Sequence, residues 1–177
     1  VNKIDLNKLS VILYYGSNTI KLKQGTDYTV SESGGNNEWS TYVYTFNKDV
    51  FKKEGEYTIS ITSDDEAGNI TSNEDEEKVA GLTFSVDETS PICSIYNLEK
   101  GKTYKESNKE VSFNVIDNIS LASVTVYLNG KELYTLTGDN LTEDNMKFTI
   151  NESTKSQTVK IVYVDTAGNS GTTEVND

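Results

Sequence analysis

The sequence predicts an all-β fold of two antiparallel β-sandwiches arranged in tandem, and three observations support this prediction. Thr, Ser, Asn, Tyr and Val recur in short alternating runs, which are typical of strands. The chain has 12 Gly and one Pro, and Gly, Asn and Asp separate the runs as turn residues do. One motif occurs twice, and the 177 residues suffice for two modules of about 90 residues that each bury a core.

Each predicted strand is a short run in which apolar and polar residues alternate. Tyr57, Ile59 and Ile61 lie on one face of such a run, and the Thr and Ser residues between them lie on the other. This pattern indicates a half-buried antiparallel strand. The predicted strands are Ser10–Tyr15, Tyr42–Phe46, Glu56–Thr62, Leu82–Val86, Glu110–Val115, Ser123–Leu128, Met146–Ile150 and Thr158–Val164.

An internal repeat divides the chain into two modules. Ile59–Asn69 aligns with Val159–Asn169 without a gap, and both copies end a strand in Asp-x-Ala-Gly-Asn. Gly and Asn tolerate positive φ, so this motif predicts a turn into the next strand, with the Asp accepting hydrogen bonds from turn amides. Upstream, Leu9–Tyr14 matches Ala122–Tyr127. We therefore expect one module at 1–86 and a second at 87–177.

The two copies differ in length ahead of the matched region. The second copy contains Ile92–Ile116, which is enough for two strands, and the first copy has no such segment. Our interpretation is that the chain begins inside its first module and lacks two of its strands. The alternative is a reduced module with an edge exposed to its neighbour.

The motifs resemble those of tandem bacterial immunoglobulin-like domains of Gram-positive cell-surface proteins. Two signatures carry this resemblance: the turn motif, present at Asp65–Asn69 and Asp165–Asn169, and a Val-Asp-x-Thr-x-Pro linker, present at Val86–Pro91. The resemblance implies two tandem immunoglobulin-like antiparallel sandwiches. It also implies an extracellular, cell-surface location, with attachment to the cell wall through regions outside these residues and neighbouring immunoglobulin-like modules of the same chain as partners.

Related modules hold calcium at domain junctions with carboxylates of this turn and of the Val-Asp linker. The matching residues are Asp65, Asp87, Glu88 and Asp165, and Asp117 lies in an Asp-Asn turn of the second copy. Oxygen-rich, acidic sites suit Ca²⁺, which takes six to eight hard oxygen ligands. These five residues are calcium candidates, and the alternative is that they cap turns or are merely solvated. We predict no other cofactor.

Three aromatic residues are candidates for a ligand surface. Trp39 follows a loop-like stretch, and together with Tyr42 and Tyr44 it could form a platform for a sugar ring. The alternative is that these side chains pack in the sandwich. A fourth aromatic residue, Tyr57, lies two residues before an inward aliphatic, as in the tyrosine corner of sandwich domains, whereas Gln157 takes its place in the second copy.

Composition excludes several classes of function. The net charge of −12 argues against nucleic acid and anionic membranes as partners, and no run approaches the roughly 18 apolar residues of a membrane helix. The chain has no His and a single Cys, Cys93, so triads, disulfides and imidazole metal sites are excluded. Carboxylates alone could support glycoside chemistry, but no paired arrangement is visible, so we predict no enzyme.

The function predicted from these observations is a non-catalytic extracellular spacer that projects a terminal functional domain from a cell surface. Two alternatives stay open. The chain could be an adhesion module that binds a host glycan or matrix protein through loops near Trp39. It could also be an accessory domain of an extracellular polysaccharide-degrading enzyme whose catalytic part lies elsewhere.

Overall fold

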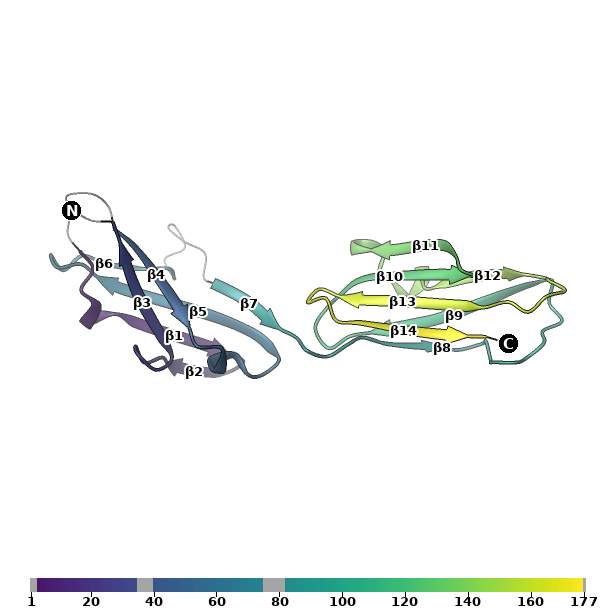
Figure 1. The fold of residues 1–177 in the computed structure, drawn as a ribbon, viewed down its shortest axis with the longest axis horizontal. Coiled ribbons are helices and arrows are strands. Elements are labelled where there is room, and N and C mark those ends of the chain that lie inside the picture. Colours follow the sequence, from purple (N-terminus) through teal and green to yellow (C-terminus); the bar gives the residue numbers. More distant parts are fainter. Residues whose placement is uncertain (1–2, 35–39, 75–81, 177) are drawn as a thin grey trace. The chain divides into compact units, whose positions relative to one another are not determined.

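The computed structural model describes residues 3–34, 40–74 and 82–176, which fold into two compact units, Val1–Val86 and Asp87–Asp177. Both units consist of antiparallel strands joined by turns and short 3₁₀ helices (Figure 1). The prediction of an all-β sandwich fold is thereby confirmed. None of the helices in the described ranges has the length and apolar character that crossing a membrane requires.

Unit 2, Asp87–Asp177, is a sandwich of a four-stranded and a three-stranded sheet. The larger sheet has the order β11-β10-β13-β14, formed by Lys131–Thr137, Leu121–Leu128, Val159–Asp165 and Ser170–Val175. The smaller sheet has the order β12-β9-β8, formed by Lys147–Asn151, Asn108–Ile116 and Ile92–Ile95. The segment Ile92–Ile116 thus provides the two strands that the sequence predicts there.

The core of unit 2 lies between these two sheets and follows the alternation of the sequence. Val111, Phe113 and Val115 of β9 are buried, whereas the residues between them are half-buried. The same alternation buries Val124 and Val126 on β10. The further buried apolar residues are Met146, Phe148, Ile150, Val159, Ile161 and Tyr163. Two-residue periodicity in both sheets therefore defines one continuous apolar layer.

Unit 1, Val1–Val86, combines a five-stranded sheet with a sheet of two strands. In the larger sheet β2, β1 and β5 are neighbours, and both β6 and β7 pair with β5. These strands are Asn18–Lys21 (β2), Ser10–Tyr15 (β1), Gly55–Asp64 (β5), Ile70–Ser72 (β6) and Leu82–Val86 (β7). The smaller sheet pairs Tyr28–Ser33 (β3) with Thr41–Phe46 (β4).

The 3₁₀ helices occupy connections between strands. In unit 1, η1 (Leu6–Lys8) precedes β1 and η2 (Lys48–Phe51) links β4 to β5. In unit 2, η3 (Gly138–Asn140) and η4 (Glu143–Asn145) lie between β11 and β12.

Tyr57 forms the tyrosine corner that the sequence suggests. Its hydroxyl donates to the backbone carbonyl of Lys53 at 2.8 Å and accepts from the backbone N–H of the same residue at 3.1 Å. Gln157 makes a comparable contact in unit 2, because its side-chain amide donates to the carbonyl of Asn151 at 2.9 Å. Tyr57 thereby attaches β5 to the connection that precedes it, and Gln157 attaches the connection before β13 to the end of β12.

Candidate metal centre

Asp165 ends strand β13 and begins the Asp-x-Ala-Gly-Asn turn of unit 2. One carboxylate oxygen, Oδ1, accepts the backbone N–H of Asn169 at 2.8 Å, and Oδ2 accepts the side-chain amide of the same residue at 2.8 Å. Asp165 is 1% exposed. Burial raises the pKa of the Asp165 carboxyl, but the hydrogen bonds from Asn169, Gly168 and Ala167 outweigh burial, so its pKa lies below the ordinary value. The structure therefore favours a charged carboxylate here.

Asp117 directly follows β9, in the connection to β10. Its Oδ2 accepts two backbone N–H groups, from Ile119 at 2.9 Å and Ser120 at 2.8 Å. These bonds are a local Asx turn, which fixes the orientation of the carboxylate. The other oxygen, Oδ1, is buried and has no hydrogen-bond partner.

Asp87 is the first residue of unit 2 and comes directly after β7. Its Oδ1 accepts the backbone N–H of Thr89 at 3.1 Å and the side-chain amide of Asn118 at 3.3 Å. The backbone carbonyl of Asp87 accepts the side-chain amide of Asn169 at 3.0 Å. Its Oδ2 is buried without a hydrogen-bond partner. The first residue of the unit is thus attached to the turn that follows β13.

These three carboxylates converge at one end of unit 2. One oxygen each from Asp87, Asp117 and Asp165 lies within 4.8 Å of the other two. Oxygen ligands of Ca²⁺ lie 2.3–2.6 Å from the ion, so two ligands on opposite sides of it are about 4.6 to 5.2 Å apart. The spacing therefore accommodates one calcium ion shared by all three groups.

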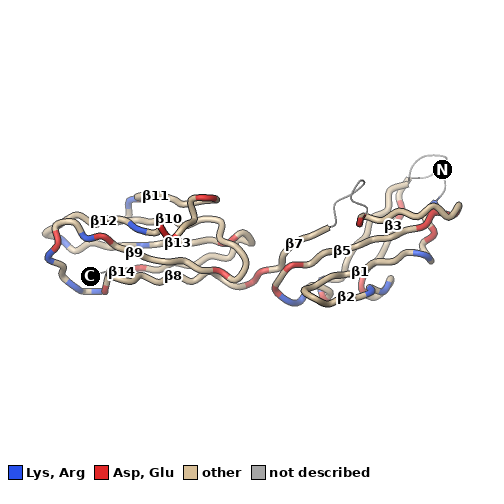
Figure 2. Tube along the Cα trace, turned by 180° about the vertical axis from the view of Figure 1, so that it is seen from behind, with Lys and Arg blue, Asp and Glu red and all other residues tan. Residues whose placement is uncertain are grey.

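The negative charges of this cluster favour the binding of a cation. None of the ion pairs between described residues involves Asp87, Asp117 or Asp165. Three carboxylates close together repel one another, and a buried carboxylate oxygen without a partner is costly. Figure 2 shows a red, acidic segment between the labels β7 and β8, whereas many lysines of unit 2, in blue, lie at its other end, near the mark C. Two orphaned oxygens and an all-oxygen donor set fit a hard divalent cation.

The other calcium candidates lie outside this cluster. Glu88 is exposed and does not belong to the group of three. Asp65 belongs to unit 1, where its Oδ1 accepts the backbone N–H groups of Ala67 and Asn69 at 2.9 and 2.8 Å. Sequence reasoning missed Asn118 and Asn169, which hold the carboxylates in place. The only signal for Asn169 was its place as the last residue of the turn motif.

The candidate aromatic surface is only partly described by the structure. Trp39 lies outside the described residues. Tyr42 and Tyr44 alternate with exposed residues on β4 and are half-buried. The hydroxyl of Tyr42 accepts the backbone N–H of Ile4 at 3.2 Å, and the ring of Tyr44 lies 6.2 Å from that of Tyr28 in the core. Tyr44 therefore packs against the core of unit 1, whereas Tyr42 is held by its hydrogen bond to Ile4.

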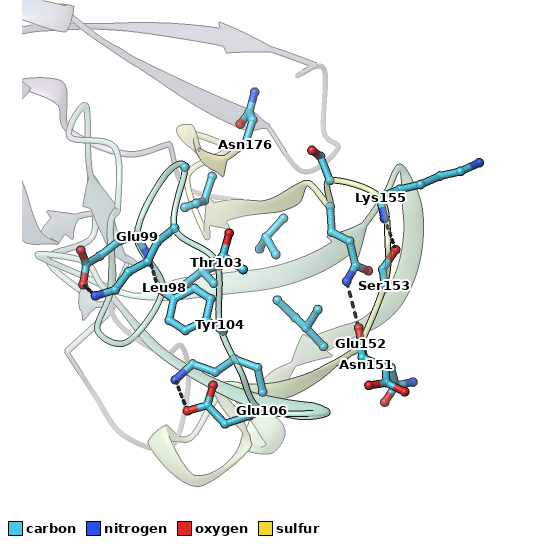
Figure 3. Close-up of a pocket in the computed structure, with 18 of the residues that line it drawn as sticks. Leu98, Glu99, Thr103, Tyr104, Glu106, Asn151, Glu152, Ser153, Lys155 and Asn176 are labelled. Atoms are coloured by element: carbon cyan, nitrogen blue, oxygen red, sulfur yellow. Dashed lines mark hydrogen bonds and ion pairs between the residues drawn. The ribbon is translucent and has the colours of Figure 1, made fainter.

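A pocket of about 500 Å³ lies at the opposite end of unit 2, between the connections that precede β9 and β13. Figure 3 shows Tyr104 on one side of this pocket and Ser153 on the other. Two of its carboxylates are paired with lysines, Glu99 with Lys102 and Glu106 with Lys109. Both ion pairs lie at the surface of the unit.

Comparisons with known proteins add little to this description. No family model matches the sequence, and no curated protein matches it. Among solved structures, the chain is similar to the fibronectin(III)-like modules of Clostridium thermocellum CbhA. The TM-score is 0.40 at 10% sequence identity, and the match covers 94% of this chain and 75% of that chain. The fold assignment rests on the sheets themselves, and no functional property is carried over.

Proposed function

We propose that this chain is a non-catalytic structural segment of an extracellular surface protein, and that its second module is stabilised by calcium at Asp87, Asp117 and Asp165. The observation that carries the proposal is the convergence of these three carboxylates, two of which have a buried oxygen without a hydrogen-bond partner. The sequence contains no His and only one Cys, and this composition supports a non-catalytic role.

The three residues join three separate parts of unit 2. Asp117 follows β9 of the smaller sheet, Asp165 ends β13 of the larger sheet, and Asp87 is the residue at which the chain reaches the sandwich. A bound calcium ion supplies positive charge that offsets the repulsion among the carboxylates. The carboxylates would then hold the two sheets and the first residue of the module together, which suits a segment that must resist unfolding and proteolysis.

The donor set also supports an extracellular location. The three carboxylates come from separate segments and not from one continuous calcium-binding loop. We therefore expect a dissociation constant of about 10⁻⁴ to 10⁻³ M, as in extracellular calcium modules. Such a site is filled where free calcium reaches millimolar concentration. We therefore propose a spacer function outside the cell, in which the module projects other parts of the same protein.

Calcium binding can be tested by thermal unfolding, because each unit carries a unique probe. Trp39 is the only Trp and lies in the sequence of unit 1, and Met146 is the only Met and is buried in the core of unit 2. With 10 mM CaCl₂ in place of chelator, we expect unit 2, followed by the Met146 methyl resonance, to gain about 1.4 to 2.7 kcal/mol. This gain corresponds to a rise in Tm of roughly 5 to 20 °C. The Trp39 transition should not move.

The variant Asp117→Asn gives the decisive control, because it retains an acceptor for the turn amides and removes one charge. It should abolish the calcium response and, in chelator, unfold at a higher temperature than the wild type because repulsion is reduced. Asp139→Asn, an exposed substitution elsewhere in unit 2, should leave the response intact. An Asp117→Asn protein with an unchanged calcium response would contradict the proposal.

A further inference from the structure

One face of β7 in unit 1 is apolar, belongs to the core side of its sheet and is open. Leu82 pairs with Ile59 of β5, and Phe84 pairs with Tyr57. Cross-strand partners point to the same face of a sheet, and Ile59 and Tyr57 are buried at 3% and 2% exposure. Leu82 and Phe84 therefore also point to the core side, yet they are 50% and 37% exposed. Leu82 is thus half exposed on the core side, whereas Phe84 is partly covered by the rings of Phe51 and Tyr57.

Unit 2 shows what covers the corresponding strand. There β14 pairs with the central strand β13 as β7 pairs with β5, and β8 lies against β14. Cys93 of β8 contacts the hydroxyl of Thr173 on β14. Next to β8, β9 pairs with β12 and carries its apolar side chains into the core. The cover over β14 thus consists of extended strands with alternating apolar residues.

Unit 1 has a shorter cover in the same place. Within residues 3–34, 40–74 and 82–86, the smaller sheet holds β3 and β4 only, and β4 pairs only with β3. Ring contacts lead from Tyr28 on β3 to Phe46 on β4, from Phe46 to Phe51 of η2, and from Phe51 to Phe84, with centroids 5.1 to 5.9 Å apart. The aromatic cluster reaches Phe84 in the middle of β7, and Leu82 at the start of the strand remains 50% exposed.

We propose that unit 1 accepts an added β-strand segment on this surface, which consists of the core face of β7 and the unpaired edge of β4. The occupant is an extended polypeptide segment in which apolar and polar residues alternate, as they do in β8 and β9. An edge strand offers N–H and C=O groups that only another backbone can pair in register, and the open face offers burial for every second side chain. This recognition is independent of the calcium site in unit 2.

A fusion protein tests the proposal with the full chain. A second copy of the sequence 91–116 would be joined to the N-terminus through a flexible Gly-Ser linker, as β8 and β9 precede β10 in unit 2. We expect the Trp39-monitored Tm of unit 1 to rise by roughly 10 °C, because apolar surface is buried and the strand edge is paired. An unchanged Met146 resonance shows that the fused copy has not displaced β8 and β9 of unit 2.

A matched control separates strand addition from a general effect of the fusion. The same fusion with Val111→Ser, Phe113→Ser and Val115→Ser in the added copy should give no rise in Tm, because its apolar face is lost. Introducing Leu82→Ser into the chain should remove at least half of the rise. Leu133→Ser in unit 2, where the side chain is 40% exposed, should not affect it.

Two outcomes would overturn the proposal. If the wild-type and Ser-substituted copies change the Tm of unit 1 equally, no strand is added to this surface. If the unfused chain dimerises in sedimentation experiments and Leu82→Ser prevents it, a second copy of the chain and not an added strand covers the face.

Discussion

The two copies of the Asp-x-Ala-Gly-Asn turn share their internal hydrogen bonds and differ in their surroundings. Oδ1 accepts the backbone N–H of the final Asn at 2.8 Å in both, for Asp65 from Asn69 and for Asp165 from Asn169. Oδ2 accepts the side-chain amide of the same Asn at 2.7 and 2.8 Å. Asp65 is half-buried, however, whereas Asp165 is 1% exposed.

This difference shows that the motif encodes a turn and that other elements make the candidate metal site. In unit 2 the second carboxylate comes from the end of β9 and the third from the segment after β7, both outside the motif. In the described part of unit 1, Asp65 belongs to no group of three acidic residues. Two copies of the turn therefore correspond to one candidate site, and counting motifs overestimates the number of candidate metal sites.

The largest effect that can test this comparison is loss of the turn carboxylate in each copy. In chelator, Asp165→Ala should lower the Tm of unit 2 by roughly 10 °C or more, and Asp65→Ala should lower that of unit 1 by about half as much. In unit 2 the amides of Asn169 would be left without acceptors in a partly buried place, and the contact of Asn169 with Asp87 would be weakened. Water can replace the lost acceptor more readily at the half-buried position of unit 1.

Calorimetry measures both transitions, with the Met146 methyl resonance and Trp39 fluorescence assigning each one to its unit. Equal losses in the two units would mean that the surroundings of Asp165 add nothing to the stability of the turn.

A smaller effect concerns the pH dependence of unit 2. The folded-state pKa of Asp165 lies below its ordinary value of about 4, so the charged form contributes stability that is present above that pH and lost as pH falls through the folded pKa. In chelator, the difference in Tm between wild type and Asp165→Asn should therefore narrow by a few degrees between about pH 5 and pH 2. Calorimetry across this range provides the test, and a difference that stays constant would show that the charge of Asp165 is not responsible.

Sequence reasoning predicts the fold class because alternation with a period of two is local. Each of the predicted runs coincides with a strand, but no predicted run covers β2, β3, β6, β8, β11 or β14. β2 consists of four exposed residues, Asn18–Lys21, whose sequence carries no apolar alternation. A short edge strand of this kind forms because it pairs with a neighbour, here β1. Its own sequence does not predict this pairing.

The sequence also did not predict the register in which the repeated strands pair. The repeat aligns Val11 with Val124, but Val11 pairs with Ile61 of β5, and Val126 pairs with Ile161, the counterpart of Ile61. The ladders therefore match with a shift of two residues. Such a shift keeps every side chain on the same face, so the alternating pattern cannot distinguish the two alignments.

The sequence supplied the acidic candidates for the site, but it did not predict which of them come together. Asp87, Asp117 and Asp165 were among five acidic candidates, and nothing in the residues themselves separates them from Asp65 and Glu88. What separates them is that β9 and β13 end on the same side of one sandwich, which is a property of the three-dimensional fold.

The smallest expected effect belongs to Glu88, which is adjacent in sequence to a cluster member and exposed. Glu88→Gln removes a charge next to Asp87 but no oxygen of the group of three. Solvent and salt screen a charge at such a position, so we expect a calcium affinity within about twofold of the wild type and a change in Tm of unit 2 below about 1 °C. Isothermal titration with CaCl₂ measures the affinity, with Asp117→Asn as the non-binding reference. A loss of affinity as large as that of Asp117→Asn would instead place Glu88 among the ligands, and the site would then depend on the charge of the linker more than on the ends of β9 and β13.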